Sequence, residues 1–265
     1  MPYLERNDTK VYYEVWGEGS GPWMTLLNGF TRGLTDFRSL GHHFTTLGWK
    51  VLALDNRGAG KTEGPLNFTL KDSVDDIQAV WTQVGCAKSH VLGISYGGLL
   101  AMHVAVAAQS NVASLSLVST TARSQFLRLD AEGASNHHES EASLMRYFSP
   151  TFIKGHKILV RSLAKEMVKA FNEPEKLAKA QAQRNAMGTF NILPALSELR
   201  VPVLIVHGSD DRVVDIGAAG EIAQKVPHAK FEVLDGNGHL LLAEAPKRLY
   251  EIVEKFCLAE EKKAK

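Results

Sequence analysis

The feature that most constrains this chain is the pentapeptide Gly93-Ile94-Ser95-Tyr96-Gly97, which lies between an apolar strand at 90–92 and a helix of small residues from about 98 to 108. A serine on a sharp strand-to-helix turn projects its hydroxyl above the sheet, and small neighbours are needed because the turn leaves no room for side chains. The helix N-terminus offers free N–H groups and a partial positive charge to a developing oxyanion. Ser95 is therefore a candidate nucleophile.

Apolar strands and amphipathic helices alternate along the rest of the chain. The expected strands span residues 10–16, 23–27, 50–54, 90–92, 112–118, 203–206 and 230–234. The expected helices span residues 36–46, 70–84, 98–108, 216–225 and 246–258. This alternation predicts an α/β fold in which a mostly parallel sheet is covered by helices on both faces. The glycine-rich segment 17–22 predicts a hairpin turn between the first two strands.

The segment from about 121 to 196 breaks the alternation because it is helix-prone, polar and poor in strands. It is too long for a plain loop. We therefore expect a helical cap that covers the strand ends, where ligands bind in open α/β folds. The expected organisation is one core domain, formed by residues 1–120 and 197–258, with the cap at 121–196. The closing charge run predicts a disordered tail at 259–265.

Composition limits the partners and the compartment. The formal net charge of +1 over 265 residues argues against a nucleic acid or an anionic membrane as partner. No apolar run approaches the roughly 18–20 residues of a membrane span, and the N-terminus has no apolar signal core. Cys86 and Cys257 lie far apart without metal-type spacing, which favours buried thiols in a reducing compartment. We expect a cytoplasmic protein without a metal or an organic cofactor, and nothing in the sequence indicates its oligomeric state.

Candidate partners for Ser95 follow the last two expected strands. A serine hydroxyl is a poor nucleophile unless a base takes its proton and a third group orients that base. One strand runs into His207, Asp210 and Asp211, and the other runs into His239. The order Ser, Asp, His along the chain is the one expected for a serine on this kind of turn. His207 competes with His239 as the base, although its position before a glycine favours a packed, hydrogen-bonded residue.

Four separated motifs resemble those of the α/β-hydrolase-fold serine hydrolases. They are Leu27-Asn28-Gly29-Phe30, Asp55-Asn56-Arg57-Gly58-Ala59-Gly60, the pentapeptide, and the paired turns Gly208…Asp211 and Gly238-His239. The segment Leu242-Ala243-Glu244-Ala245-Pro246 also resembles the family, and the match covers nearly the whole chain except the cap. Ser119–Arg123 and Tyr147–Pro150 are similar to segments of small esterases and lactonases such as 3-oxoadipate enol-lactonase. Asp55 and Arg57 are expected to make structural contacts in their turn.

The resemblance implies roles for particular residues. Ser95 would be the nucleophile, His239 the general base, and Asp211, the second carboxylate of its turn, the group that orients His239. The backbone N–H groups of Phe30 and Tyr96 would form the oxyanion hole. Further candidates for the substrate pocket are Asn28, Gly29, Tyr147, Phe148, Val213 and Leu240.

One position departs from the family pattern. The family usually has His-Gly where this chain has Asn28-Gly29. An asparagine can still hydrogen-bond the loop, and the N–H of Phe30 does not depend on the side chain at position 28. The departure therefore puts the conformation of the loop in doubt rather than the mechanism.

The expected function is hydrolysis of a carboxylic ester or a lactone, a small-molecule substrate, through an acyl-enzyme. Two alternatives stay open: a carbon–carbon bond hydrolase that uses the same triad, and a non-catalytic ligand-binding receptor with this fold. The cations Arg123, Arg128, Arg146 and Lys154 in or near the cap could meet an anionic substrate or belong to solvated helix faces.

Overall fold

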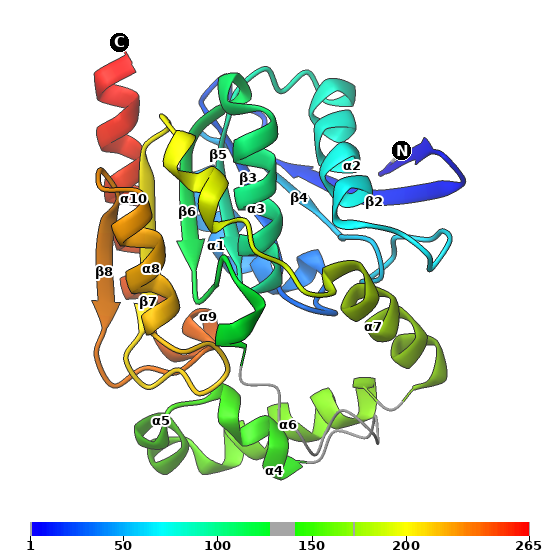
Figure 1. Cartoon of the computed structure of the whole chain (residues 1–265), viewed down its shortest axis with the longest axis vertical. Coiled ribbons are helices and arrows are strands. Elements are labelled where there is room, and N and C mark those ends of the chain that lie inside the picture. The colour runs from blue at the N-terminus through cyan, green and yellow to red at the C-terminus, as the bar shows by residue number, and fades with distance from the viewer. Residues whose placement is uncertain (1, 128–140, 172, 265) are drawn as a thin grey trace.

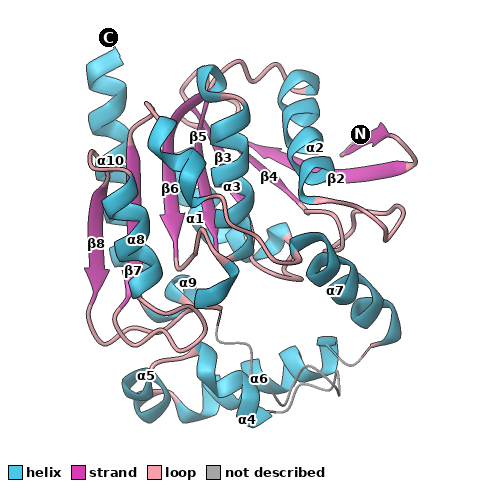
Figure 2. Ribbon diagram, in the orientation of Figure 1, coloured by secondary structure: helices cyan, strands magenta, loops and turns pink. Residues whose placement is uncertain are grey.

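The computed structural model describes residues 2–127, 141–171 and 173–264, and it confirms an α/β architecture (Figures 1 and 2). The described residues form an eight-stranded sheet of order β1-β2-β4-β3-β5-β6-β7-β8, in which β2 runs antiparallel to both its neighbours, β1 and β4, and all other neighbouring strands are parallel. The strands are β1 (Tyr3–Arg6), β2 (Thr9–Trp16), β3 (Trp23–Leu27), β4 (Lys50–Leu54), β5 (Ser89–Ile94), β6 (Val112–Val118), β7 (Val203–Gly208) and β8 (Lys230–Leu234). The α-helices are α1 (Arg38–Thr46), α2 (Leu70–Gln83), α3 (Tyr96–Ala107), α4 (Glu141–Leu144), α5 (Pro150–Gly155), α6 (Lys157–Phe171), α7 (Pro174–Met187), α8 (Gly217–Lys225), α9 (Leu241–Glu244) and α10 (Pro246–Ala264).

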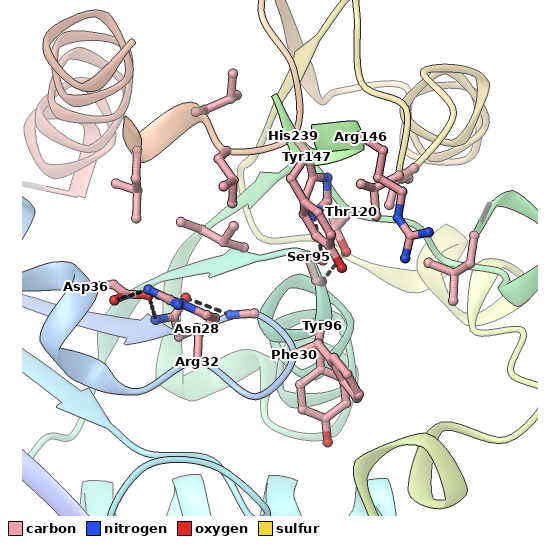
Figure 3. Close-up of a pocket in the computed structure, with 18 of the residues that line it drawn as sticks. Asn28, Phe30, Arg32, Asp36, Ser95, Tyr96, Thr120, Arg146, Tyr147 and His239 are labelled. Atoms are coloured by element: carbon pink, nitrogen blue, oxygen red, sulfur yellow. Dashed lines mark hydrogen bonds and ion pairs between the residues drawn. The ribbon is translucent and has the colours of Figure 1, made fainter. Parts of the chain in front are cut away.

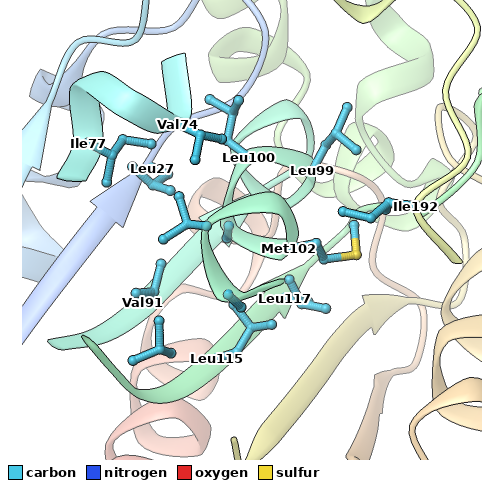
Figure 4. Close-up of a cluster of buried hydrophobic side chains, with 14 of the residues drawn as sticks. Leu27, Val74, Ile77, Val91, Leu99, Leu100, Met102, Leu115, Leu117 and Ile192 are labelled. Carbon is cyan, nitrogen blue, oxygen red and sulfur yellow. The ribbon is translucent and has the colours of Figure 1, made fainter. Parts of the chain in front are cut away.

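The sheet separates two hydrophobic cores. Successive side chains of a strand point to opposite faces, so Leu27 joins the core under α2, α3 and α8 while Leu26 joins the core under α1 and α10. Figure 4 shows the first core, where Met102 of α3 lies against Leu117 of β6. Burial on both faces explains why the parallel strands read as continuous apolar runs.

The prediction of a hairpin between β2 and β3 is wrong. Strand β2 pairs with β4, and β3 lies on the other side of β4. The segment 17–22 therefore crosses over β4 instead of turning back beside β2. Two glycines allow this path: a Cβ on Gly17 would meet the carbonyl oxygen of Trp49, and a Cβ on Gly21 would meet that of Gly48. The hydrophobic pattern of a segment can identify it as a strand, but it does not show which strand lies beside it. Strand β3 is buried along almost its whole length, as a central strand requires.

The N-terminal strand β1 is missing from the sequence prediction. It forms a hairpin with β2 through Asn7 and Asp8, which have φ values of 45° and 58°. Asparagine and aspartate tolerate this left-handed region better than other residues with a side chain. The Asn-Asp pair was the available signal for this turn.

Residues 259–264, for which a disordered tail is expected, continue α10 in the structure; Lys265 lies outside the described residues. Glu260 is buried and accepts a hydrogen bond from Lys263 at 2.7 Å. Glu261 accepts one from His90 of β5 at 3.0 Å. The charge run therefore forms the last turn of a helix, in which Glu260 is buried and Glu261 bonds back to the sheet.

Helices α4 to α7 lie between β6 and β7 in the chain, and α4, α5 and α6 lie beyond the ends to which the arrows of β6 and β8 point in Figure 1. The described part of 121–196 is mainly helical, as expected, while residues 128–140 and 172 lie outside the description. The division of the chain into a core domain and a cap stays a prediction. In the described ranges, we find no helix of sufficient length and apolar character to cross a membrane.

Candidate active site

Ser95 lies on a strained turn between β5 and α3. Its φ of 54° and ψ of −118° place a residue with a side chain in a region that costs on the order of 1–3 kcal/mol. A Cβ on Gly93 would collide with the carbonyl oxygen of Gly97, and one on Gly97 would collide with that of Leu27. These contacts explain the two glycines of the pentapeptide. The Ser95 N–H donates to the Val118 carbonyl oxygen at 2.9 Å, which ties the turn to β6.

Ser95, His239 and Asp211 form one hydrogen-bonded chain. Nε2 of His239 lies 3.1 Å from Oγ of Ser95, and its Nδ1 lies 2.8 Å from Oδ2 of Asp211. His239 and Asp211 are buried, at 3% and 5% exposure. The Ser95 hydroxyl is thus within reach of an imidazole whose other nitrogen is held by a carboxylate, an arrangement in which the imidazole can take and return a proton.

The environment of Asp211 favours its ionised form. Burial alone would raise the pKa of this carboxyl group, but the charge of His239 and hydrogen bonds from His207 and His239 outweigh burial and hold the pKa well below its usual range. Oδ1 also accepts the backbone N–H groups of Val213 and Val214 at 2.8 and 2.9 Å. Asp211 therefore stays an anion beside the imidazole.

The two competing residues occupy other positions. The carboxylate of Asp210 accepts a hydrogen bond from Ser209 at 3.4 Å, and its N–H donates to the carbonyl oxygen of Asn237. His207 is fully buried; its Nε2 lies 3.1 Å from the carbonyl oxygen of Val214 and 3.3 Å from Oδ2 of Asp211. The structure thus brings Asp211 rather than Asp210 to His239, and it places His207 behind Asp211 as a packed partner.

The residues expected to hold an oxyanion lie on two elements next to Ser95. Tyr96 opens α3, where an N–H has no partner within the helix. Phe30 lies in the loop after β3, directly after Gly29, whose missing Cβ would stand only 3.6 Å from Cβ of Ser95. The loop therefore passes close to the serine, as an oxyanion hole requires.

The side chain of Asn28 holds this loop. Its Oδ1 accepts the Gly29 N–H at 2.7 Å, and its Nδ2 donates to the Gly33 carbonyl oxygen at 2.6 Å and to Asp36 at 3.0 Å. Figure 3 shows Asn28 and Arg32 directed toward Asp36. An amide can donate and accept at the same time, which answers the doubt raised by the departure from the family's His-Gly.

A cavity of about 530 Å³ opens over Ser95. All six predicted pocket residues line it: Asn28, Gly29, Tyr147, Phe148, Val213 and Leu240. Apolar residues that the sequence prediction missed also line it: Leu99, Leu127, Leu163, Met167, Met187 and Phe190. Leu163 and Met167 lie four residues apart on α6, so helical spacing was the signal that could have found them.

A segment of the predicted cap is attached to the loop that carries His239. The carbonyl oxygen of Tyr147 accepts the N–H groups of His239 and Leu240 at 3.0 and 3.2 Å, and the rings of Tyr147 and His239 pack edge to face at 5.6 Å. The carboxylate of Glu244 accepts the N–H groups of Ser149 and Gly238 at 2.9 and 3.0 Å. These contacts fix the position of the His239 loop.

The cationic side chains considered above for an anionic substrate lie in different environments. Arg146 lines the cavity, Arg123 pairs with Glu221, and Lys154 is exposed on α5. Arg128 lies outside the described residues. Arg184 of α7, which was not predicted, lines the cavity with its guanidinium 5.2 Å from the centre of the Phe30 ring. Within the part of the chain that the structure describes, no group of three or more His, Cys, Asp or Glu side chains is placed to hold a metal ion.

Comparison with known proteins agrees with the fold. Residues 22–246 match the alpha/beta hydrolase fold family, and the chain belongs to this family. It is 26% identical to "Putative carbamate hydrolase RutD" of Azorhizobium caulinodans over 97% of this chain and 98% of that protein. It is also 26% identical to 3-oxoadipate enol-lactonase 1 of Acinetobacter baylyi over 78% of each chain. The crystal structure of the enol-lactonase from Burkholderia xenovorans superimposes with a TM-score of 0.82 at 22% identity, covering 96% of this chain and 99% of that one.

Proposed function

We propose that this protein is a serine hydrolase that cleaves a carboxylic ester or a lactone through a covalent acyl-enzyme. The observation that carries the proposal is the hydrogen-bonded chain from Ser95 through His239 to Asp211 at the floor of an apolar cavity. Membership in the alpha/beta hydrolase fold family supports it.

The mechanism follows from these positions. His239 takes the proton of the Ser95 hydroxyl as Oγ attacks the substrate carbonyl, and the N–H groups of Phe30 and Tyr96 hold the oxyanion that develops. The imidazolium is stabilised by Asp211 and then protonates the leaving alcohol, which leaves an ester between Ser95 and the acyl group. His239 next activates a water that attacks this ester, and the acid is released.

The cavity supports a small substrate with a largely apolar body. Its volume of about 530 Å³ falls within the usual range of small-molecule sites, and apolar side chains dominate its lining. Two relatives are named as a putative carbamate hydrolase and an enol-lactonase, and hydrolysis at a carbonyl carbon is the reaction that this site is suited to perform.

A fluorophosphonate probe tests the enzyme class. We expect it to label wild-type protein and Ser110→Ala, a control at an exposed serine, but not Ser95→Ala.

A panel of p-nitrophenyl esters of different chain lengths then tests the bond type, and Ser95→Ala should lose turnover by a factor on the order of 10⁶. Equal labelling of wild type and Ser95→Ala would contradict the enzyme assignment and favour a binding protein. Labelling without turnover of any ester would favour a carbon–carbon bond hydrolase.

A further inference from the structure

Gln183 lies where helix α7 contacts the loop after β3. Its side chain is fully buried. Its Oε1 accepts the N–H of Thr31 at 2.7 Å, and its Nε2 donates to the carbonyl oxygen of Arg57 at 2.7 Å. One side-chain amide from the predicted cap thus binds the backbones of two loops, one of which carries Phe30.

The loop that receives this contact is strained. Gly29 to Arg32 form a four-residue turn closed by the hydrogen bond from the Arg32 N–H to the Gly29 carbonyl oxygen, at 3.1 Å. Its third residue, Thr31, has a φ of 61°. A turn with this φ at its third position normally carries glycine there, and a β-branched residue is an outlier in this region. Thr31 therefore needs an external contact to hold its conformation, and the Gln183 acceptor supplies one.

The other end of the Gln183 contact is rigid. The guanidinium of Arg57 makes two buried hydrogen bonds to Asp76 of α2, at 2.6 and 3.0 Å. Gly58 lets α7 approach closely, since a Cβ there would lie 2.8 Å from Cγ of Gln183 and 2.9 Å from the carbonyl oxygen of Lys179. Gln183 is thus held against a fixed turn on one side while it holds the Thr31 N–H on the other.

We propose that Gln183 is a positioning residue for the oxyanion hole: by holding Thr31 in its left-handed conformation, it keeps the N–H of the preceding Phe30 directed at the reacting carbonyl oxygen. The inference rests on the proposed function, which makes Phe30 an oxyanion donor. The position of α7 would then affect catalysis, because displacement of this helix would release the loop next to the nucleophile.

The test uses the full chain and three variants. Gln183→Met keeps the size of the side chain and removes both hydrogen bonds. Gln181→Met, on the same helix, is the matched control, since Gln181 donates a hydrogen bond to Asn185 at the surface. In the double variant Gln183→Met/Thr31→Gly, glycine adopts the positive φ without strain, so the loop no longer depends on the contact.

Kinetics separate positioning from a structural role. Removing one oxyanion donor outright lowers kcat by about 10²–10³-fold, so misplacing one should lower kcat of Gln183→Met on a p-nitrophenyl ester by about 10- to 100-fold. We expect KM to change less than about threefold. The inhibition constant of a trifluoromethyl ketone, which forms an oxyanion on the enzyme, should rise in parallel with the loss of kcat/KM. The double variant should recover part of kcat, and Gln181→Met should match the wild type.

Three results would contradict a positioning role for Gln183. A folded Gln183→Met with kcat within twofold of wild type, a loss confined to KM, or a double variant no faster than the single one would overturn the inference. Thermal unfolding is measured first. If Gln183→Met does not fold, Gln183→Ser, which leaves room for water at both backbone groups, takes its place in the same comparison. A wild-type protein that the fluorophosphonate does not label would instead remove the proposed function itself.

Discussion

At the scale of single residues, the choice between two adjacent carboxylates shows what the tertiary structure adds. Asp210 and Asp211 are chemically identical and sit in the same turn, so no local pattern separates them. In the folded chain, only Asp211 faces His239, and its other oxygen accepts two backbone N–H groups. The resemblance to the family pointed to the second position, and the geometry shows why that position is suited to orient the imidazole.

Substitution of each carboxylate tests this distinction. Asp211→Asn should lower kcat by about 10⁴-fold, because an amide holds the imidazole in the wrong tautomer and does not stabilise the imidazolium. Asp210→Asn, the neighbouring control, should keep kcat within about threefold of the wild type. Steady-state hydrolysis of a p-nitrophenyl ester measures both. Equal losses in the two variants would mean that the turn, and not the Asp211 carboxylate, supports His239.

At the scale of elements, the last helix is held by a contact that begins in the sheet. His90 of β5 is buried; its Nδ1 lies 2.7 Å from the Ser114 hydroxyl, and its Nε2 lies 3.0 Å from Glu261 of α10. Burial lowers the pKa of His90, and the hydrogen bond and charge of Glu261 only partly offset this. The end of α10, which reads as a solvated charge run, is thus anchored to a buried imidazole.

The burial of His90 predicts a pH dependence of stability. Because the pKa of His90 is lower in the folded than in the unfolded chain, the unfolded state binds more protons as the pH falls below about 6.5. The free energy of unfolding should then fall by up to about 1.4 kcal/mol per pH unit from this residue, down to the folded pKa. Urea titrations at pH 8 and pH 5.5 measure the slope. His90→Gln should show a smaller slope than wild type or the control His228→Gln, and an unchanged slope in His90→Gln would disprove the role of His90.

At the scale of the whole molecule, two continuous cores on either side of one sheet leave no thiol accessible. Cys86 and Cys257 are buried and free. Burial raises the pKa of the Cys86 thiol to about 11 and that of Cys257 to about 12. The expectation of buried thiols is confirmed for both residues, and their exposure to a reagent requires the protein to open.

Thiol reactivity therefore reports on global opening. At pH 8 the native protein should react very slowly with Ellman's reagent, because fewer than about one in 10³ thiols with such a pKa is ionised. In 6 M guanidinium chloride, both cysteines of each chain should react within the mixing time. Fast reaction of one equivalent in native protein would show that one of the cores opens locally.

What the sequence determined by itself was the identity and order of most elements, the class of the fold and the candidate nucleophile. These follow from local physics: strand and helix periodicity, glycines that a sharp turn requires, and polar residues placed just after strands. The pairing of β2 with β4, the anchoring of α10 through Glu261 and the contact of Gln183 with Thr31 were decided only by the tertiary structure. Each of these joins residues far apart along the chain, and such a contact depends on how the elements pack around the two cores, which no local pattern encodes.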